Sequence, residues 1–157
     1  MQNTAKQLEP SALEAIAEGL NQCLAETVVE TMKAQNYHWN VTGMGFGPLH
    51  ALFQQMYEDH FEAQDEIAER IKAIDGHAVG KLSDHLARSE VTECDGTVDA
   101  KTMIANLQAD QETLAGTLYA LGEVAASHGD KLTEDLANTR GLVHEKFAWI
   151  LRAHLKG

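Results

Sequence analysis

The sequence predicts an all-α protein built as one four-helix bundle with a long crossover. Apolar residues recur every three or four positions over four long segments, which is the spacing of one face of an amphipathic helix. Polar or glycine-containing breaks separate these segments. A chain of 157 residues with 44% apolar composition can bury one core and is too short to favour two. We expect a short N-terminal arm over residues 1–10 and one bundle domain over residues 11–157.

The first helix is expected from Ser11 to about Trp39, because Pro10 suits a helix start. Its apolar stripe consists of Leu13, Ile16, Leu20, Leu24, Val28 and Met32. Three closely spaced glycines then interrupt the pattern, and Pro48 is well placed to open the second helix. That helix is expected to end at Asp75-Gly76, and its stripe is Leu49, Phe53, Met56, Tyr57, His60, Ile67, Ile71 and Ile74.

Residues 76–98 are mixed and polar, with a short helical segment expected around Ser83 to Arg88. A link of this length allows a long crossover between the second and third helices in place of a tight hairpin. Asp99 suits the N-cap of the third helix, which is expected to stop near His128-Gly129. Its stripe is Met103, Ile104, Leu107, Leu114, Leu118, Leu121 and Val124. The fourth helix begins near Asp130, and its stripe is Leu132, Leu136, Val143, Phe147, Ile150 and Leu151.

The charge balance disfavours nucleic acid as a partner. Aspartate and glutamate number 24 against 12 lysines and arginines, a formal charge of −12, which repels a phosphate backbone. The acidic excess either attracts metal cations or simply keeps the surface hydrated. Two cysteines without a CxxC pair fit a reducing compartment. No signal peptide or stretch of 18 uninterrupted apolar residues is found, so we expect a cytoplasmic protein without a membrane span.

Two histidines bracket the glycine-rich break in NYHWNVTGMGFGPLH, residues 36–50. His38 falls on the inner face of the first helix, and His50 stands at the head of the second. An isolated histidine on such a face is more often a core ring hydrogen-bonded to a carbonyl. The pairing of the two across the bend favours a metal-ligand role, although neither spacing proves a site.

Asp65 and Glu69 are four residues apart and project from one face of the second helix. They share that face with Glu58 and Glu62, so a solvated acidic face explains them on composition alone. His50 and Asp65 are separated by about 22 Å of continuous helix at 1.5 Å per residue. One chain therefore cannot bring both to a single ion. A shared site would need a second copy whose second helix runs antiparallel about a two-fold axis, which would create two identical sites.

The stretch from about residue 24 to 74 resembles the mini-ferritins called Dps, or DNA-binding proteins from starved cells. The resemblance lies in HWNVTG at 38–43, then Phe46, Leu49-His50, Phe53, Tyr57 and DEIAER at 65–70. His144-Glu145-Lys146 followed by Trp149 is also similar to the family. The resemblance implies a ferritin-like bundle, and it implies that the ferroxidase ligands are His38, His50, Asp65 and Glu69, contributed across a dimer interface.

The family resemblance further implies oxidation of Fe(II), preferentially by hydrogen peroxide, and storage of ferric iron in a hollow dodecamer. Imidazole and carboxylate ligands suit ferrous iron with open positions better than closed tetrahedral zinc. Trp39 is expected near the site, either intercepting stray oxidising equivalents or packing at the dimer contact. Asp130, Glu134 and Asp135 are candidates for an acidic iron-uptake pore, although acids at a helix N-terminus are also ordinary capping chemistry.

The sequence departs from the family where DNA binding is concerned, because the arm MQNTAKQLEP carries Lys6 alone and the C-terminal LRAHLKG adds only Arg152 and Lys156. We expect little or no DNA retention at neutral pH. Two other functions stay open. One is a non-catalytic or DNA-compacting shell with vestigial metal residues. The other is a zinc enzyme or metal-binding module, against which the absence of HExxH argues, since Ala148 stands where the second histidine would be.

Overall fold

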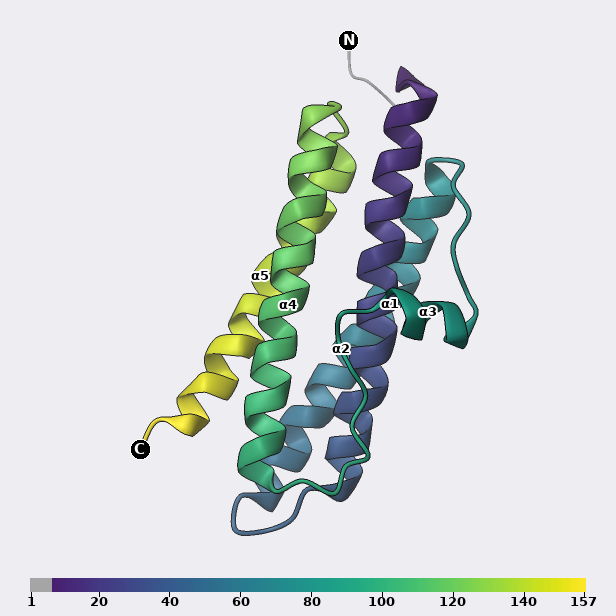
Figure 1. Ribbon diagram of the computed structural model, residues 1–157. Coiled ribbons are helices and arrows are strands. Elements are labelled where there is room, and N and C mark those ends of the chain that lie inside the picture. The colour runs from purple at the N-terminus through teal and green to yellow at the C-terminus, as the bar shows by residue number, and fades with distance from the viewer. Residues whose placement is uncertain (1–6) are drawn as a thin grey trace.

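The computed structural model describes residues 7–157, so most of the expected arm, including Lys6, lies outside the described residues. This part of the chain contains five α-helices and no strand, which confirms the predicted all-α class. The helices are α1 (Pro10–Asn40), α2 (Phe46–Ala73), α3 (Leu82–Arg88), α4 (Ala100–Ser127) and α5 (Lys131–Leu155). Figure 1 shows the four long helices as a bundle in which α1 lies beside α2 and α4 beside α5. No helix in residues 7–157 is long and apolar enough to cross a membrane.

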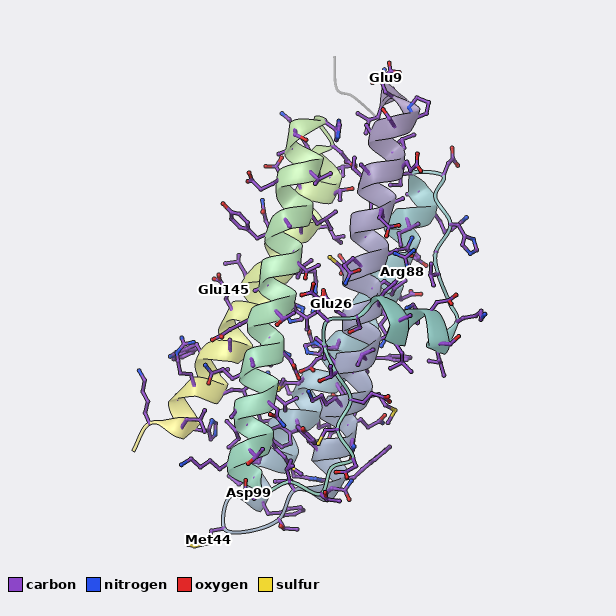
Figure 2. The ribbon with its side chains drawn as sticks, in the orientation of Figure 1. Glu9, Glu26, Met44, Arg88, Asp99 and Glu145 are labelled. Atoms are coloured by element: carbon purple, nitrogen blue, oxygen red, sulfur yellow. The ribbon has the colours of Figure 1, made fainter. Side chains whose placement is uncertain are left out.

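The helix ends follow from residues that the sequence places there. Pro10 occupies the first position of α1, and Asp99 caps α4 by accepting a hydrogen bond from Thr102 N. Gly43 has a φ of +102° in the turn between α1 and α2, a conformation that glycine adopts without strain. Figure 2 shows Met44 in this turn, at the opposite end of the bundle from Glu9.

The crossover between α2 and α4 is attached to α1 by polar side chains. Asn21 donates to His77 O and accepts from Val79 N, at 2.9 and 3.0 Å. Gln22 donates to Arg88 O at the end of α3, and Asn36 donates to Cys94 O. These contacts hold the backbone of the crossover against the bundle, with α3 packed on α1 (Figure 1).

The core consists of two main apolar clusters separated along the bundle axis. The cluster at the Met44 end includes Tyr37, Phe53, Met56, Leu107 and Leu151. The cluster at the other end includes Ile16, Leu20, Ile71, Leu118 and Leu121. Between them lie buried polar side chains from all four long helices, of which the predicted stripes included only His60.

Two residues of the predicted stripes are exposed, namely Met32 at 48% and Leu132 at 68%. Successive steps of four residues advance about 40° around a helix, so the series from Leu20 to Met32 drifts off the buried face. The interior face of α1 continues instead through Ala34 and Tyr37. Leu132 points away from the neighbouring Thr133, which is buried.

Candidate metal centre

His38 and His50 form a stacked pair across the turn between α1 and α2. Their ring centroids are 3.7 Å apart and the ring planes meet at 14°. His38 Nδ1 donates to the backbone oxygen of His50 at 2.6 Å, and His50 Nδ1 donates to the backbone oxygen of His38 at 2.7 Å. Because a carbonyl oxygen only accepts, each Nδ1 must carry the proton, which leaves the Nε2 lone pair of each ring for another ligand.

Histidines that bind metals in proteins usually have this arrangement, in which one ring nitrogen donates a hydrogen bond to a neighbouring acceptor. A backbone carbonyl on one ring nitrogen fixes the tautomer and directs the other nitrogen to the metal. His38 is therefore hydrogen-bonded to a carbonyl, as expected for a core histidine, and this bond is also compatible with the role of a metal ligand. The turn brings the two imidazoles together, as the sequence suggested.

Asp65 and Glu69 do not join the histidines within one chain. Both are exposed on α2, which is continuous from Phe46 to Ala73, so the separation along the helix axis is that of a rigid rod. Among residues 7–157, no group of three or more histidine, cysteine, aspartate or glutamate side chains is placed to hold a metal ion. A single subunit thus has the two histidines at the turn and the two carboxylates on the exposed face of α2, so neither place contains the full expected ligand set.

An apolar groove lies between these two places. One part, of about 510 Å³, lies near the end of α1 and is lined by Met32, Trp39, Phe61 and Leu86. An adjoining part, of about 600 Å³, includes Asp65 in its wall. The groove displays large exposed apolar side chains: Met32, Trp39, Phe61, Leu82 and Leu86. A patch of this kind is typical of a protein–protein contact.

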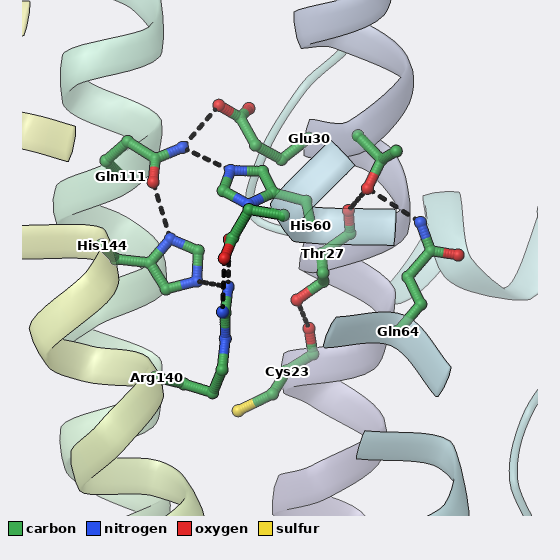
Figure 3. Close-up of polar contacts among 10 residues, drawn as sticks. Cys23, Thr27, Glu30, His60, Gln64, Gln111, Arg140 and His144 are labelled. Atoms are coloured by element: carbon green, nitrogen blue, oxygen red, sulfur yellow. Dashed lines mark hydrogen bonds and ion pairs between the residues drawn. The ribbon is translucent and has the colours of Figure 1, made fainter. Parts of the chain in front are cut away.

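The centre of the bundle holds a second pair of histidines in a polar layer, which we define as Glu30, Lys33, Asp59, His60, Asp110, Gln111, Arg140 and His144. Figure 3 shows its central contacts. Gln111 Nε2 donates to Glu30 Oε1 at 2.9 Å and to His60 Nε2 at 3.0 Å. His144 Nδ1 donates to Gln111 Oε1 at 2.6 Å. Each of the four long helices contributes two residues to the layer.

Fixed cations complete the polar layer. The Arg140 guanidinium makes two hydrogen bonds to the Asp59 carboxylate, at 3.1 and 2.8 Å, and donates to His144 Nε2 at 3.3 Å. His60 Nδ1 donates to Asp59 Oδ2. Lys33 Nζ lies 2.6 Å from Asp110 Oδ2. Two of the three acidic side chains of this layer, Asp59 and Asp110, are thus paired with side-chain cations.

Burial decides the protonation of the polar layer. Burial lowers the pKa of His60, although the neighbouring Asp59 acts to raise it. Burial also lowers the pKa of His144, and the nearby His60 and Arg140 add to this decrease. Burial also raises the pKa of Glu30, and the neighbouring Asp110 adds to the effect. Burial alone would raise the pKa of Asp59, but hydrogen bonds from His60 and Arg140 hold it below its ordinary value. Both histidines are therefore neutral near pH 7, and the carboxyl of Glu30 favours its protonated form more strongly than an exposed glutamate does.

The other residues selected from the sequence lie in different surroundings. Trp39 is 59% exposed in the last turn of α1. Asp130 is buried, where it caps α5 through Thr133 and pairs with Arg70 at 2.8 Å. Glu134 is half-buried and Asp135 is exposed. The carboxylate of Asp130 is thus bonded to Thr133 and Arg70 within the chain, while Asp135 is exposed to solvent.

The polar layer was not predicted from the sequence, in which His60 was assigned only to the apolar stripe of the second helix. A signal was present, because Glu30, His60, Gln111 and His144 interrupt the interior faces of four different helices at one level of the bundle. Only the pairing of those helices shows that the interruptions meet.

Comparison with known proteins identifies the class to which this bundle belongs. The family described as Ferritin-like domain matches residues 17–157. A relative from Bacillus anthracis, named DNA protection during starvation protein 2, is 35% identical over 140 residues, covering 89% of this chain and 96% of that protein. The chain belongs to the Dps family of ferritin-like proteins.

Solved structures agree with this assignment. The Dps protein from Bacillus brevis superposes with a TM-score of 0.91 at 31% identity, covering 95% of this chain and all of that one. The Dps protein from Vibrio cholerae O1 gives a TM-score of 0.92 at 29% identity and covers 99% and 98% of the two chains. That protein is described as a member of a broad superfamily of ferritin-like diiron-carboxylate proteins. Family membership gives this chain an iron-related, mini-ferritin function.

Proposed function

We propose that this protein is a mini-ferritin ferroxidase that oxidises Fe(II) at sites shared between two subunits. His38 and His50 of one subunit would bind the ion together with Asp65 and Glu69 of the partner subunit. Ferric iron would be stored inside a hollow dodecamer in the cytoplasm. Removing ferrous iron and peroxide together would protect the cell from oxidative damage.

The observation that carries this proposal is the incompleteness of the site in one chain. The Nδ1 protons of His38 and His50 are hydrogen-bonded to carbonyl oxygens. The exposed carboxylates of Asp65 and Glu69 lie on α2, far along this helix from His50. An isologous dimer with antiparallel α2 helices would bring each half-site to its complement and would form two equal sites.

The apolar groove supports a contact at this face. Five large apolar side chains that line it are exposed in the single subunit, and burying such surface is the usual driving force for stable association. The groove runs beside both half-sites, because its wall includes Trp39 at one end and Asp65 at the other. A partner covering it would therefore also exclude water from the metal.

The proposed donor set suits ferrous iron, since imidazole and carboxylate bind it while leaving positions for an oxidant. Two ferrous ions give one electron each to hydrogen peroxide, which with two protons becomes two water molecules; oxygen is the alternative oxidant. The residues of this chain would hold the ions and exclude solvent. Trp39 would either supply an electron to stray oxidants or pack at the contact between subunits.

Iron uptake is assigned to acidic side chains near the start of α5. Of the three candidates, Glu134 and Asp135 keep carboxylates that can face a channel, whereas Asp130 is already bonded to Arg70 and Thr133. We therefore assign the uptake role chiefly to Glu134 and Asp135.

The direct test follows Fe(II) oxidation by absorbance, with peroxide and with oxygen, in the parent and in His38→Ala and Asp65→Ala variants. Both substitutions are expected to abolish most of the peroxide-dependent rate. His77→Ala and Glu66→Ala are matched controls, because these residues are exposed and outside the proposed site. Parental rates in both site variants would leave a non-catalytic shell as the better explanation.

A mixing experiment tests whether the site is shared. Subunits carrying His38→Ala and subunits carrying Asp65→Ala are unfolded, combined in equal amounts and refolded. Each mixed dimer contains one intact site, so roughly a quarter of the parental activity is expected to return. A site made within one subunit predicts no recovery.

Little DNA retention is expected despite the names of the relatives. The net charge of −12 per subunit repels the phosphate backbone over distances of about 8 Å at physiological salt. A gel-shift assay at low and physiological salt checks this at neutral pH. A clear shift at neutral pH would show that local basic residues overcome the overall charge.

A further inference from the structure

Phe46 is the outermost ring in a column of four aromatic side chains at the turn. Its ring centroid lies 5.0 Å from that of His50, with the planes at 24°. His50 in turn stacks on His38 at 3.7 Å. His38 also makes an edge contact with Tyr57, at 5.3 Å and 76°. Each imidazole of the pair is therefore in contact with one further aromatic ring.

The two outer rings differ in their relation to the core. Tyr57 packs against the apolar cluster that contains Phe53 and Met56. Phe46 belongs to none of the apolar clusters found in residues 7–157, and it is 44% exposed. Core packing explains the position of Tyr57 but not that of Phe46.

The local sequence delivers Phe46 to His50. Gly43 adopts a φ of +102°, and its carbonyl accepts a hydrogen bond from Phe46 N at 3.1 Å. Phe46 is the first residue of α2, so its side chain and that of His50 lie one turn apart on the same helix face. The turn thus fixes the backbone that carries the stacking ring.

The stack restrains a motion that the hydrogen bond of His50 leaves free. The Nδ1 contact to a carbonyl selects the tautomer and limits rotation of the ring, but a single hydrogen bond allows the ring to tilt. A flat aromatic ring on the outer face of a half-exposed imidazole opposes that tilt. Restraining a ligand before the metal arrives reduces the entropy lost on binding.

We propose that Phe46 is a positioning residue of the metal centre, holding His50, and His38 through it, in the orientation that binds the ion. The inference rests on the proposed metal-binding role of the two histidines. It assigns to Phe46 an effect on metal affinity that passes through His50 and does not require direct contact with the metal.

The test measures Co(II) binding to the assembled protein by its visible absorbance, which also reports the coordination geometry. Phe46→Ala is expected to weaken Co(II) binding about ten-fold, the lower end for residues that orient metal ligands. Phe46→Tyr keeps the stacking ring and should bind close to the parental value. Met44→Ala is the matched control, since this residue is fully exposed in the same turn.

A double-mutant cycle separates positioning from general structure. In a His50→Ala background, Phe46→Ala is expected to cause no further loss of Co(II) affinity, because its effect is transmitted by His50. Thermal unfolding and size-exclusion chromatography are recorded for each variant. Phe46→Ala should unfold and elute like the parent.

Three results would overturn the proposal: parental Co(II) affinity in Phe46→Ala, an additive loss in the double variant, or a smaller assembly that accounts for the weaker binding. A different result would contradict the proposed metal-binding role of His38 and His50. If His38→Ala and His50→Ala bind Co(II) as the parent does, the imidazole pair is not a metal site, whatever the behaviour of Phe46.

Discussion

The protein contains two pairs of neighbouring histidines whose surroundings give them opposite properties. His38 and His50 stack at the turn, and backbone oxygens accept their Nδ1 protons. His60 and His144 lie at the bundle centre with ring centroids 5.0 Å apart. There, Gln111 donates to Nε2 of His60 and Arg140 donates to Nε2 of His144. The first pair keeps Nε2 lone pairs for a ligand, whereas the second uses both its ring nitrogens inside the protein.

The contrast explains where this bundle can bind metal. Diiron proteins with a ferritin-like fold place carboxylates and histidines in the bundle interior. In this chain the interior already contains Lys33 paired with Asp110 and Arg140 paired with Asp59. The negative charges of Asp59 and Asp110 are thus balanced by side-chain cations. Free donor atoms remain at the turn and on the exposed face of α2.

The largest expected effect is a double dissociation between the two histidine pairs. His50→Ala should weaken Co(II) binding by about 100-fold and lower the free energy of unfolding by only about 1 kcal/mol, for one lost hydrogen bond. His144→Ala should lower the free energy of unfolding by roughly 3–4 kcal/mol, because it leaves a cavity and unpaired buried groups. Co(II) affinity of the folded protein should not change.

Chemical unfolding at fixed subunit concentration and Co(II) titration measure both quantities. Loss of Co(II) binding in folded His144→Ala would mean that the bundle centre takes part in metal binding. The comparison between the two pairs would then fail.

Gln111→Leu tests the connectivity of the polar layer. It removes the donor to Glu30 and His60 and the acceptor for His144, so buried groups lose partners at about 1–3 kcal/mol each. We expect the free energy of unfolding to fall by about 3 kcal/mol in denaturant titrations. Gln108→Leu is the control one turn away, since Gln108 bonds to the exposed Glu112, and should change stability by less than about 0.5 kcal/mol.

The pH dependence of stability should contain two opposing contributions from the polar layer. His60 and His144 have pKa values lowered from 6.5, so the unfolded chain takes up protons first and their contribution is lost as pH falls through 6.5. Glu30 has a pKa raised from 4.5, so the unfolded chain releases its proton first. Its contribution is present at low pH and is lost as pH rises above 4.5 toward its folded pKa.

Glu30→Gln isolates the second contribution, because an amide of similar shape replaces the carboxyl and cannot ionise. The variant should be more stable than the parent at pH 8, because the unfolded parent releases the proton of Glu30 at that pH whereas the amide has no proton to release. The advantage should shrink toward pH 5. Denaturant unfolding from pH 5 to 8 provides the measurement, and equal slopes in parent and variant would contradict the assigned protonation.

The smallest effects are expected for the acidic residues near the start of α5. Asp130 is hydrogen-bonded inside the chain, whereas Glu134 and Asp135 keep carboxylates that can face a channel. Asp130→Ala should destabilise the protein by about 1–2 kcal/mol, because it removes the cap of α5 and the partner of Arg70. Combined Glu134→Gln and Asp135→Asn should leave stability nearly unchanged and slow iron uptake. Uptake kinetics beside thermal unfolding distinguish these results, and unchanged kinetics would remove the two acids from the uptake path.

Much of the local structure could be predicted from the sequence. The expected helix from Ser11 to Trp39 is Pro10–Asn40, and the short segment around Ser83 to Arg88 is the helix Leu82–Arg88. Apolar periodicity and capping residues are local signals, which explains the agreement. The stripe of α1 failed at Met32, because spacing alone does not show how a long helix turns relative to its neighbours. The layer around Gln111 was not predicted, since its partners come from four separate helices.

The sequence by itself determined the helices, the glycine turn that brings His38 next to His50, and the separation of both from Asp65 by a rigid helix. These properties depend on residues close in the chain and on fixed backbone geometry. Only the tertiary structure decided which of the two histidine pairs keeps free ring nitrogens and which polar residues meet in the interior. Those properties depend on helix pairing and burial, which set hydrogen-bond partners and protonation states that no local pattern encodes.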